Sequence, residues 1–460
     1  MLLSSFRRAF GAACLLLAPP PLTAHAQTAA GEAIVYSNAT IIDGTGAPPR
    51  AGQDMLVRGE RIVAIGPHDS LTGAAVSGAR TVDLGGRFVM PGLIDSHVHM
   101  ATPPDREQAQ AVLRRDLFGG VTAVRDMADD LRSVAELARE TRMAEIPGPD
   151  IYFAAIMAGR PFFADPRVSA ASRGYEPGTA PWMQAIDAHS DLKTAVTLAR
   201  GTGASAIKIY ADLPPELVAG IVREAHRQGI MAWAHSAVFP TRPARVIAAG
   251  PDSVSHVCYL AYQVEPVMLA AYEDRTPVNE ALLAQNGDDP VMAELYRAMI
   301  ARKMVLDATG SLFVQFEAIR KAQPGAKPLR CTGAAVTRLT RQAWQAGVEI
   351  STGTDHVGEA DVRWPEVHDE LFFLARDVGM PPLAVIRSAT LIGARAAGQE
   401  KEMGSLEPGK LANFLVLTQD PSVDIGHIRS IETVVKRGRA YARADYSPTA
   451  PTVMEGKDGH

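Results

Sequence analysis

The sequence has few cysteines, no block of like charge and no long apolar run. Only three of its 460 residues are cysteine, and none are spaced as CxxC, so a disulfide framework is not expected. Cys258 and Cys331 could still form one bridge. The net charge of −5 is small and no Lys/Arg cluster is present, which argues against nucleic acid as a partner. No apolar stretch reaches the ~20 residues that a membrane span needs.

A glycine-rich phosphate loop after an early strand is also absent, which disfavours a doubly wound open sheet. Instead, eight apolar runs alternate with segments of helical period over residues 89–399. We read strands at Gly92–His99, Val121–Met127, Asp150–Met157, Ala206–Tyr210, Met231–Ser236, Ser253–Tyr259, Val305–Gly310 and Glu349–Asp355. Helical patterns between them include Gln108–Leu117, Asp191–Arg200, Pro215–Gln228 and Thr337–Ala346. This alternation predicts an α/β fold, a (β/α)8 TIM barrel.

Both ends of the chain are rich in short strand-like segments. Residues 33–88 and 400–443 carry β-branched runs separated by glycine turns. Neither segment is large enough for a domain, so we expect one small β-sandwich domain built from both. Residues 446–460 contain proline, glycine and threonine and are expected to be a disordered tail.

Residues 1–26 have the pattern of a removable signal peptide. Arg7-Arg8 is a basic start, Ala9–Leu17 is apolar, and Ala24-His25-Ala26 is a small-x-small cleavage site. We therefore expect an exported protein, periplasmic or secreted. Either the general or the twin-arginine export route would fit.

Side chains that bind metals stand at the ends of the predicted strands. The first strand carries His97 and His99, which share a face because strand residues alternate. Strands four, five, six and eight carry, in order, Lys208, His235, His256 and Asp355. The carboxyl ends of barrel strands meet at one face, where active sites lie. The sequence therefore predicts a metal site there.

Four motifs carry a resemblance to a known family. They are Pro91-Gly-Leu-Ile-Asp-Ser-His-Val-His99, Gly120-Val-Thr-Ala-Val-Arg-Asp126, Gly353-Thr-Asp355 and Gly404-Ser-Leu-Glu-Pro-Gly-Lys410. With them, the chain resembles the amidohydrolase superfamily of metal-dependent hydrolases. The branch it most resembles holds imidazolonepropionase-like proteins and prolidase-like dipeptidases.

The resemblance implies two divalent metal ions, with zinc the best match to imidazole and carboxylate ligands. His97, His99 and Asp355 would hold one, and His235 and His256 the other. Lys208 would bridge them as a carboxylated lysine, because an ammonium group offers no acceptor to a cation. Metal-bound hydroxide would attack a carbonyl carbon, with Asp355 as the catalytic base and then acid.

The expected reaction is cleavage of an amide or peptide bond in a small molecule, with a prolidase-like dipeptide as the first candidate. Tyr210 and Arg160 are candidate substrate-binding residues. Prolidase-like proteins often carry Gly-Gly-His-Gly after strand three, whereas Ala158–Arg167 has no histidine here.

Three alternatives remain open on the sequence. One is a mononuclear, imidazolonepropionase-like enzyme that opens a cyclic amide, with Lys208 structural. Another is an ester or lactone hydrolase. The third is a non-catalytic exported binding protein. A homo-oligomer is compatible with all of them.

Overall fold

The computed structural model describes residues 31–449, apart from residues 74–75, 285–288, 324, 326–328, 357 and 359. The predicted signal peptide and residues 450–460 of the predicted tail lie outside this part of the chain. Tyr446, at the start of the predicted tail, is described, and its ring stacks on Phe118 with 5.6 Å between centroids. Among the described residues, no helix is both long and apolar enough to cross a bilayer.

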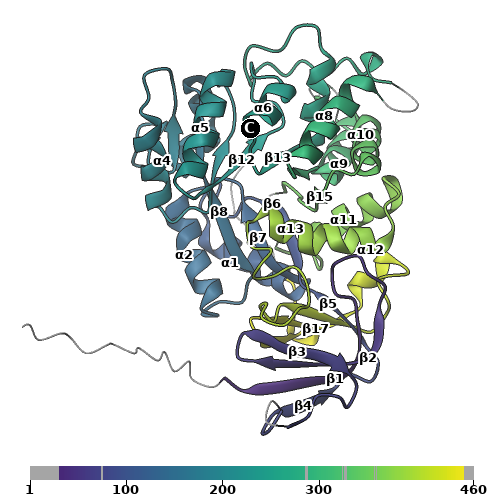
Figure 1. Ribbon diagram of the computed structural model, residues 1–460. Helices are drawn as coiled ribbons and strands as arrows, with labels where there is room; N and C mark the ends of the chain where they lie inside the picture. The colour runs from purple at the N-terminus through teal and green to yellow at the C-terminus, as the bar shows by residue number, and fades with distance from the viewer. Residues whose placement is uncertain are drawn as a thin grey trace, which may run out of the picture.

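Eight parallel strands form a nearly closed barrel in the larger part of the molecule (Figure 1). They are β6 (Leu93–Val98), β7 (Val121–Asp126), β8 (Asp150–Ala158), β11 (Ala206–Ile209), β12 (Met231–His235), β13 (Ser253–Ser255), β14 (Val305–Asp307) and β15 (Ile350–Ser351). The segment that follows the last strand meets the first strand through two backbone hydrogen bonds. Ser96 N donates to Thr352 O and Asp355 N donates to His97 O, both at 2.8 Å. The predicted barrel is confirmed.

Helices cover the outside of the barrel, as Figure 1 shows. The longer ones are α1 (Arg106–Phe118), α2 (Leu131–Arg142), α4 (Leu192–Gly201), α5 (Pro215–Arg227), α8 (Pro290–Ala301), α9 (Gly310–Lys321) and α10 (Gly333–Ala346). Shorter ones are α3 (Pro166–Ala171), α6 (Pro243–Ala249), α7 (Val257–Leu260), α11 (Val367–Phe372), α12 (Pro382–Arg387) and α13 (Gly393–Ala396). Helix α5 shows why they form: Val218, Ile221, Val222 and Ala225 recur at helical spacing and are all buried on the barrel side.

Strands from both ends of the chain form a second sheet of eight strands. It contains β1 (Ala33–Ile41), β2 (Arg50–Arg58), β3 (Arg61–Pro67), β4 (Arg80–Asp83), β5 (Phe88–Pro91), β16 (Phe414–Leu417), β17 (Ile431–Lys436) and β18 (Arg439–Ala442). β5 pairs with both β1 and β16, and this joins the two ends of the chain. Their apolar side chains share one core that includes Ile34, Met55 and Phe414. Because β5 extends to Pro91, the barrel begins at Leu93 rather than at residue 89.

Two small strands are inserted after the third barrel strand. β9 (Thr179–Ala180) pairs with β10 (Met183–Ala185), and β10 pairs in parallel with the end of β8. This insertion, with α3, lies beside the carboxyl end of the barrel strands.

Three barrel strands end several residues before the point that the sequence pattern predicts. They end at Ser255, Asp307 and Ser351 rather than at Tyr259, Gly310 and Asp355. Beyond each strand, one residue turns the chain through a left-handed conformation: His256 has φ 70°, Thr309 has φ 50° and Asp355 has φ 57°. Residues other than glycine seldom adopt such angles, and those that do cluster at functional sites. The turns direct these three side chains into the barrel mouth.

Cys258 and Cys331 form a disulfide across 73 residues of sequence. It joins α7, which follows His256 directly, to the segment that leads into α10.

Candidate metal centre

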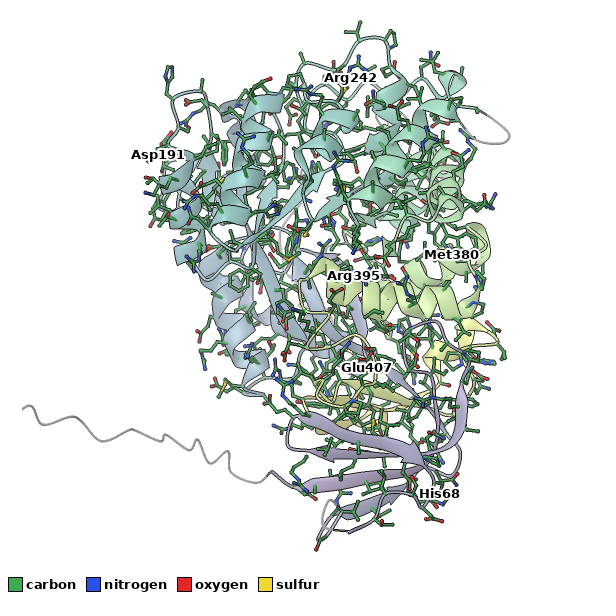
Figure 2. The ribbon with its side chains drawn as sticks, in the orientation of Figure 1. His68, Asp191, Arg242, Met380, Arg395 and Glu407 are labelled. Carbon is green, nitrogen blue, oxygen red and sulfur yellow. A yellow bond between two sulfur atoms is a disulfide. The ribbon has the colours of Figure 1, made fainter. Side chains whose placement is uncertain are left out.

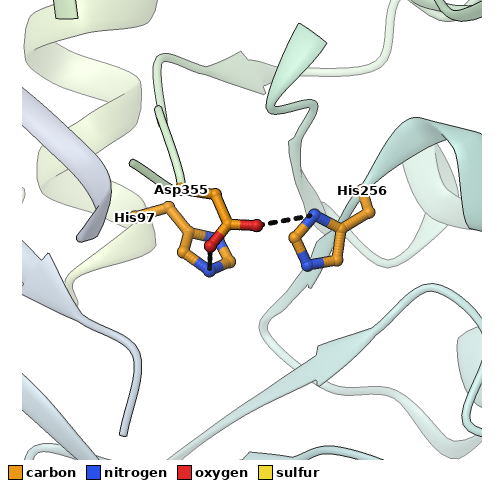
Figure 3. A group of neighbouring side chains, drawn as sticks. All are labelled: His97, His256 and Asp355. Carbon is orange, nitrogen blue, oxygen red and sulfur yellow. Dashed lines mark ion pairs between the residues drawn. The ribbon is translucent and has the colours of Figure 1, made fainter. Parts of the chain in front are cut away.

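Four of the six predicted ligands converge at the carboxyl ends of the barrel strands. His97 Nε2 and His99 Nε2 lie 3.3 and 3.2 Å from Asp355 Oδ1. His256 Nδ1 lies 3.8 Å from Asp355 Oδ2, so that Asp355 stands between His97 and His256 (Figure 3). Ligand atoms of His97, His256 and Asp355 all lie within 4.8 Å of one another. A single ion can therefore be reached by all three side chains after small shifts.

The other two predicted ligands, His235 and Lys208, face the same point. His235 ends β12, and its ring centroid is 4.8 Å from that of His256. Its Nδ1 atom is buried and has no hydrogen-bond partner. Lys208 lies in β11 with no exposed surface, and its Nζ donates to Ser255 Oγ at 3.3 Å. Among the described residues no carboxylate forms an ion pair with it, so a buried amine with three possible donors has one hydroxyl partner.

His97 and His99 each have the other ring nitrogen, Nδ1, held from outside the centre, whereas in His256 Nδ1 both faces Asp355 and contacts Thr309. His97 Nδ1 lies 2.7 Å from Asp307 Oδ2, His99 Nδ1 lies 3.0 Å from Asp129 Oδ1, and His256 Nδ1 lies 2.9 Å from Thr309 Oγ1. A carboxylate on Nδ1 fixes the ring and leaves Nε2 free, which is the arrangement of metal-binding histidines. For His97 and His99, Nε2 is the atom that faces Asp355.

Asp307 is the centre of a buried network beneath the histidines. Its Oδ2 also accepts from Ser255 Oγ at 3.0 Å and lies 3.4 Å from Arg125 Nη2. Arg125 is fully buried and lies over the Trp233 ring at 4.6 Å. The guanidinium supplies the counter-charge that an ionised Asp307 needs inside the barrel.

The protonation states of these groups suit a divalent cation. Burial lowers the pKa of Lys208 to about 7 despite the nearby carboxylates, and lowers the pKa of His256 to about 3. Burial also brings the pKa of His235 well below its usual value. Burial opposes ionisation of Asp355, but His97, His99 and His256 outweigh it and hold its pKa far below the usual range. Neutral imidazoles and an ionised carboxylate are the forms that bind metals.

His99 is the exception. Burial would lower its pKa, but the adjacent Asp129 carboxylate outweighs this effect and raises the pKa to about 10. A cation at Nε2 would therefore have to displace a proton from this ring.

The residues present fit a divalent metal centre. The donor set contains nitrogen and oxygen only, which suits zinc and similar ions. The unpartnered Nδ1 of His235 is the clearest sign, because a buried polar atom with no partner costs free energy unless something binds it.

A cavity opens from the centre toward the segment that follows β8. It is lined by His99, Thr102, Ala128, Ile156, Phe162, Asp165, Arg167, Val168, Met183 and Tyr210. Tyr210 thus reaches the site, with its ring centroid 4.1 Å from that of His235. Arg160 does not line the cavity: its side chain is exposed and donates to Pro177 O at 3.4 Å.

Sequence reasoning missed Asp129 and Asp307, which hold two of the histidines. Asp307 ends a barrel strand as several ligands do, so the same positional rule would have found it. Asp129 lies three residues beyond β7 in a loop, where no spacing or periodicity marks it.

A second group of acids and a histidine lies on the other sheet. His68 and Asp69 surround Asp54, at the end of the molecule opposite the barrel (Figure 2). Asp54 accepts hydrogen bonds from the backbone N–H groups of Asn38 and Asp69 at 2.9 Å and contacts His68 at 2.8 Å. The carboxylate oxygens of Asp54 are therefore already used to hold the backbone at Asn38 and Asp69.

Residues 88–441 match the Amidohydrolase family. The chain belongs to this family. Amidohydrolases generally bind divalent metals, and this protein is a hydrolase that acts on carbon–nitrogen bonds.

Among curated amidohydrolase relatives, imidazolonepropionase of Symbiobacterium thermophilum is 23% identical over 410 residues, which cover 84% of this chain and 89% of that protein. A solved Xaa-Pro dipeptidase with bound methionine matches with a TM-score of 0.69 and 22% identity, covering 89% of this chain and 100% of that one. A. niger ochratoxinase matches with a TM-score of 0.70 and 21% identity, and the match covers 91% of this chain and 97% of that one. At these identities the two structures show the shared fold.

Proposed function

We propose that the protein is a binuclear metal-dependent hydrolase that cleaves an amide or peptide bond in a small molecule. The observation that carries the proposal is the convergence of six predicted ligands, with the buried Nδ1 of His235 left without a partner. His97, His99 and Asp355 would hold one ion, and His235 and His256 the second. Zinc is the metal we propose, from the imidazole and carboxylate donors.

Lys208 is the proposed bridge between the two ions, as a carboxylated lysine. Its pKa of about 7 leaves a large fraction of the amine neutral near neutral pH. The amine nitrogen adds to the carbon of carbon dioxide and releases a proton, which gives a carbamate with two acceptor oxygens. This converts a buried amine with one hydroxyl partner into an anionic ligand.

In the reaction, Asp355 would move the proton. Its low pKa keeps it ionised, so it can accept a proton from the attacking water and pass it to the leaving amine. Bound metal ions would supply activation of water and polarisation of the substrate carbonyl. Tyr210, beside His235 at the cavity, is placed to contact substrate.

Two substrate classes are supported by the comparisons. A dipeptide with an Xaa-Pro-like bond is our first proposal, from the fold shared with a Xaa-Pro dipeptidase. A cyclic amide opened at a single metal is the second, because the sequence match to an imidazolonepropionase covers most of both chains.

Metal content per chain tests the proposal. Protein prepared with added zinc and bicarbonate is expected to hold two ions per chain, and Lys208→Ala is expected to hold fewer and to lose activity. Short carboxylic acids such as propionate should restore part of the activity of Lys208→Ala, because they can replace the carbamate oxygens. One ion per wild-type chain would overturn the binuclear proposal in favour of the cyclic-amide one. Bound metal without hydrolysis of any amide or ester would indicate a binding protein.

We also propose that the mature chain is exported. The signal-like pattern of residues 1–26 supports this, and so does the Cys258–Cys331 disulfide, since disulfides persist mainly in oxidising compartments. Amino-terminal sequencing of protein from a periplasmic fraction should find a chain that begins at Gln27. A chain retaining residues 1–26 in the cytoplasm would contradict export.

A further inference from the structure

We infer that the cavity beside the metal centre takes an uncharged apolar group of the substrate, such as an aromatic ring or a branched aliphatic chain. The inference rests on the proposed function and adds to it the chemical class of one half of the substrate. Phe162 is the residue that we assign as its main specificity determinant.

The cavity is continuous with the site of reaction. His99, a proposed ligand, and Tyr210, beside His235, both line it. A substrate group bound in the cavity would therefore lie next to the substrate bond that is cleaved at the proposed metal centre.

Half of the lining is apolar and comes from separate elements. The apolar side chains are Ala128, Ile156, Phe162, Val168 and Met183. All five are buried, and the Phe162 ring lies 4.4 Å from that of Tyr210 between centroids. Removing apolar surface from water at such walls is favourable in proportion to the area buried, whereas an unpaired charge there is costly.

Besides His99, two ionisable side chains line the cavity, Asp165 and Arg167, and their charges neutralise each other. Arg167 Nη2 lies 2.6 Å from Asp165 Oδ2, and Arg167 Nε lies 3.1 Å from both carboxylate oxygens. Asp165 also accepts from the backbone N–H of Arg167 at 2.9 Å. Arg160, the other arginine of this loop, is exposed outside the cavity. The lining therefore holds no uncompensated cation for a substrate carboxylate.

The segment after β8 supplies the aromatic part of the cavity wall. In the 3-10 helix Arg160–Ala164, Phe162 and Phe163 are buried while Arg160 faces solvent. This loop thereby contributes the aromatic ring of Phe162 to the cavity wall.

Hydroxamates test the inference without requiring hydrolysis, because each binds divalent metals through the same group while its substituent varies. Calorimetric titration of the zinc-loaded protein would compare acetohydroxamate, benzohydroxamate and 4-carboxybenzohydroxamate. Burial of the ring is expected to make benzohydroxamate bind roughly 10-fold or more tightly than acetohydroxamate. The 4-carboxylate is expected to remove most of that gain.

Two variants and a control locate the effect. Phe162→Ala should lose most of the preference for benzohydroxamate while acetohydroxamate binding is kept, which also shows that the variant is folded. Asp165→Asn leaves the charge of Arg167 uncompensated and should improve 4-carboxybenzohydroxamate relative to benzohydroxamate. Leu198→Ala removes a half-exposed side chain of α4, away from the cavity lining, and should change neither ratio.

Equal affinities for acetohydroxamate and benzohydroxamate, or an unchanged preference in Phe162→Ala, would overturn the inference. Failure of all three hydroxamates to bind would overturn the metal centre and the inference together. A clear preference for benzohydroxamate in a protein that hydrolyses no amide would support the cavity and contradict the proposed hydrolysis.

Discussion

At the scale of single residues, the metal centre depends on side chains that contact its histidines rather than the proposed metal ions. Asp129 holds His99 Nδ1 at 3.0 Å and is itself held by Thr102 Oγ1 and Ala101 N, both at 2.6 Å. The carboxylate thus has a fixed position and fixes the imidazole in turn. Its charge also makes the ring a stronger ligand.

We predict that Asp129→Asn lowers zinc affinity by roughly 10- to 100-fold. The amide would still fit but cannot supply the negative charge beside Nδ1. Competition with a chelating dye would measure the change.

The matched control is the next residue, Asp130→Asn. Asp130 caps α2 by accepting from Arg132 N, and asparagine caps helices equally well. Zinc affinity should be the same as in wild type. If Asp129→Asn also leaves the affinity unchanged, Asp129 does not tune His99.

At the scale of an element, the position of α9 matters because the residue before it, Thr309, holds His256. The first N–H groups of α9 are accepted by a side chain from another helix: Gly310 N and Ser311 N donate to Glu370 at 3.1 and 2.7 Å. Glu370 lies in α11 and is fully buried. Burial raises the pKa of Glu370 to about 7, although these hydrogen bonds oppose the rise.

We predict that Glu370 makes stability depend on pH between about 4.5 and 7. The unfolded chain loses this proton near the ordinary glutamate value, before the folded chain does, so the free energy of unfolding falls as pH rises through this window. The total change is up to about 3 kcal/mol. Urea unfolding of metal-free wild type and Glu370→Gln at several pH values would measure it.

The difference in unfolding free energy, wild type minus Glu370→Gln, should decrease from pH 4.5 to pH 7 and be constant above. A difference that is the same at every pH would show that Glu370 titrates alike in both states.

At the scale of the whole molecule, buried charges join the second sheet to the barrel. Asp150, at the start of β8, lies 2.9 Å from Lys436 Nζ at the end of β17 and 2.9 Å from Arg437 Nε. The Lys436 side chain is 3% exposed, and it also donates to Thr141 O at 2.7 Å. Removal of Asp150 would leave this ammonium buried without a counter-charge.

We predict that Asp150→Asn lowers the free energy of unfolding by about 3–5 kcal/mol, since breaking one partner of a buried pair leaves an uncompensated charge. Glu60→Gln is the matched control, because Glu60 pairs with the same Arg437 at 2.8 Å but its side chain is 57% exposed. Its loss should cost at most about 1 kcal/mol. Urea unfolding would compare the two. Equal effects would mean that burial of Lys436 does not set the strength of this junction.

Much of this architecture could be predicted from the chain alone. Apolar runs such as Ala206–Ile209 mark barrel strands, and strand alternation puts His97 and His99 on one face. The strand ends predicted six metal-ligating side chains, and the structure brings four of them, His97, His99, His256 and Asp355, into contact. Loop geometry could not be predicted: the sequence pattern places His256 and Asp355 in strands, whereas both lie beyond the strands and themselves adopt left-handed conformations.

The sequence by itself determined the barrel, the second sheet formed from both ends of the chain, and the set of side chains at the barrel mouth. These follow from local periodicity and from the meeting of parallel strand ends at one face. Only the tertiary structure decided that Asp129 and Asp307 hold His99 and His97, and that Phe162 rather than Arg160 lines the cavity. Such contacts join segments that are distant in sequence or lie in irregular loops, where packing, not periodicity, sets the direction of each side chain.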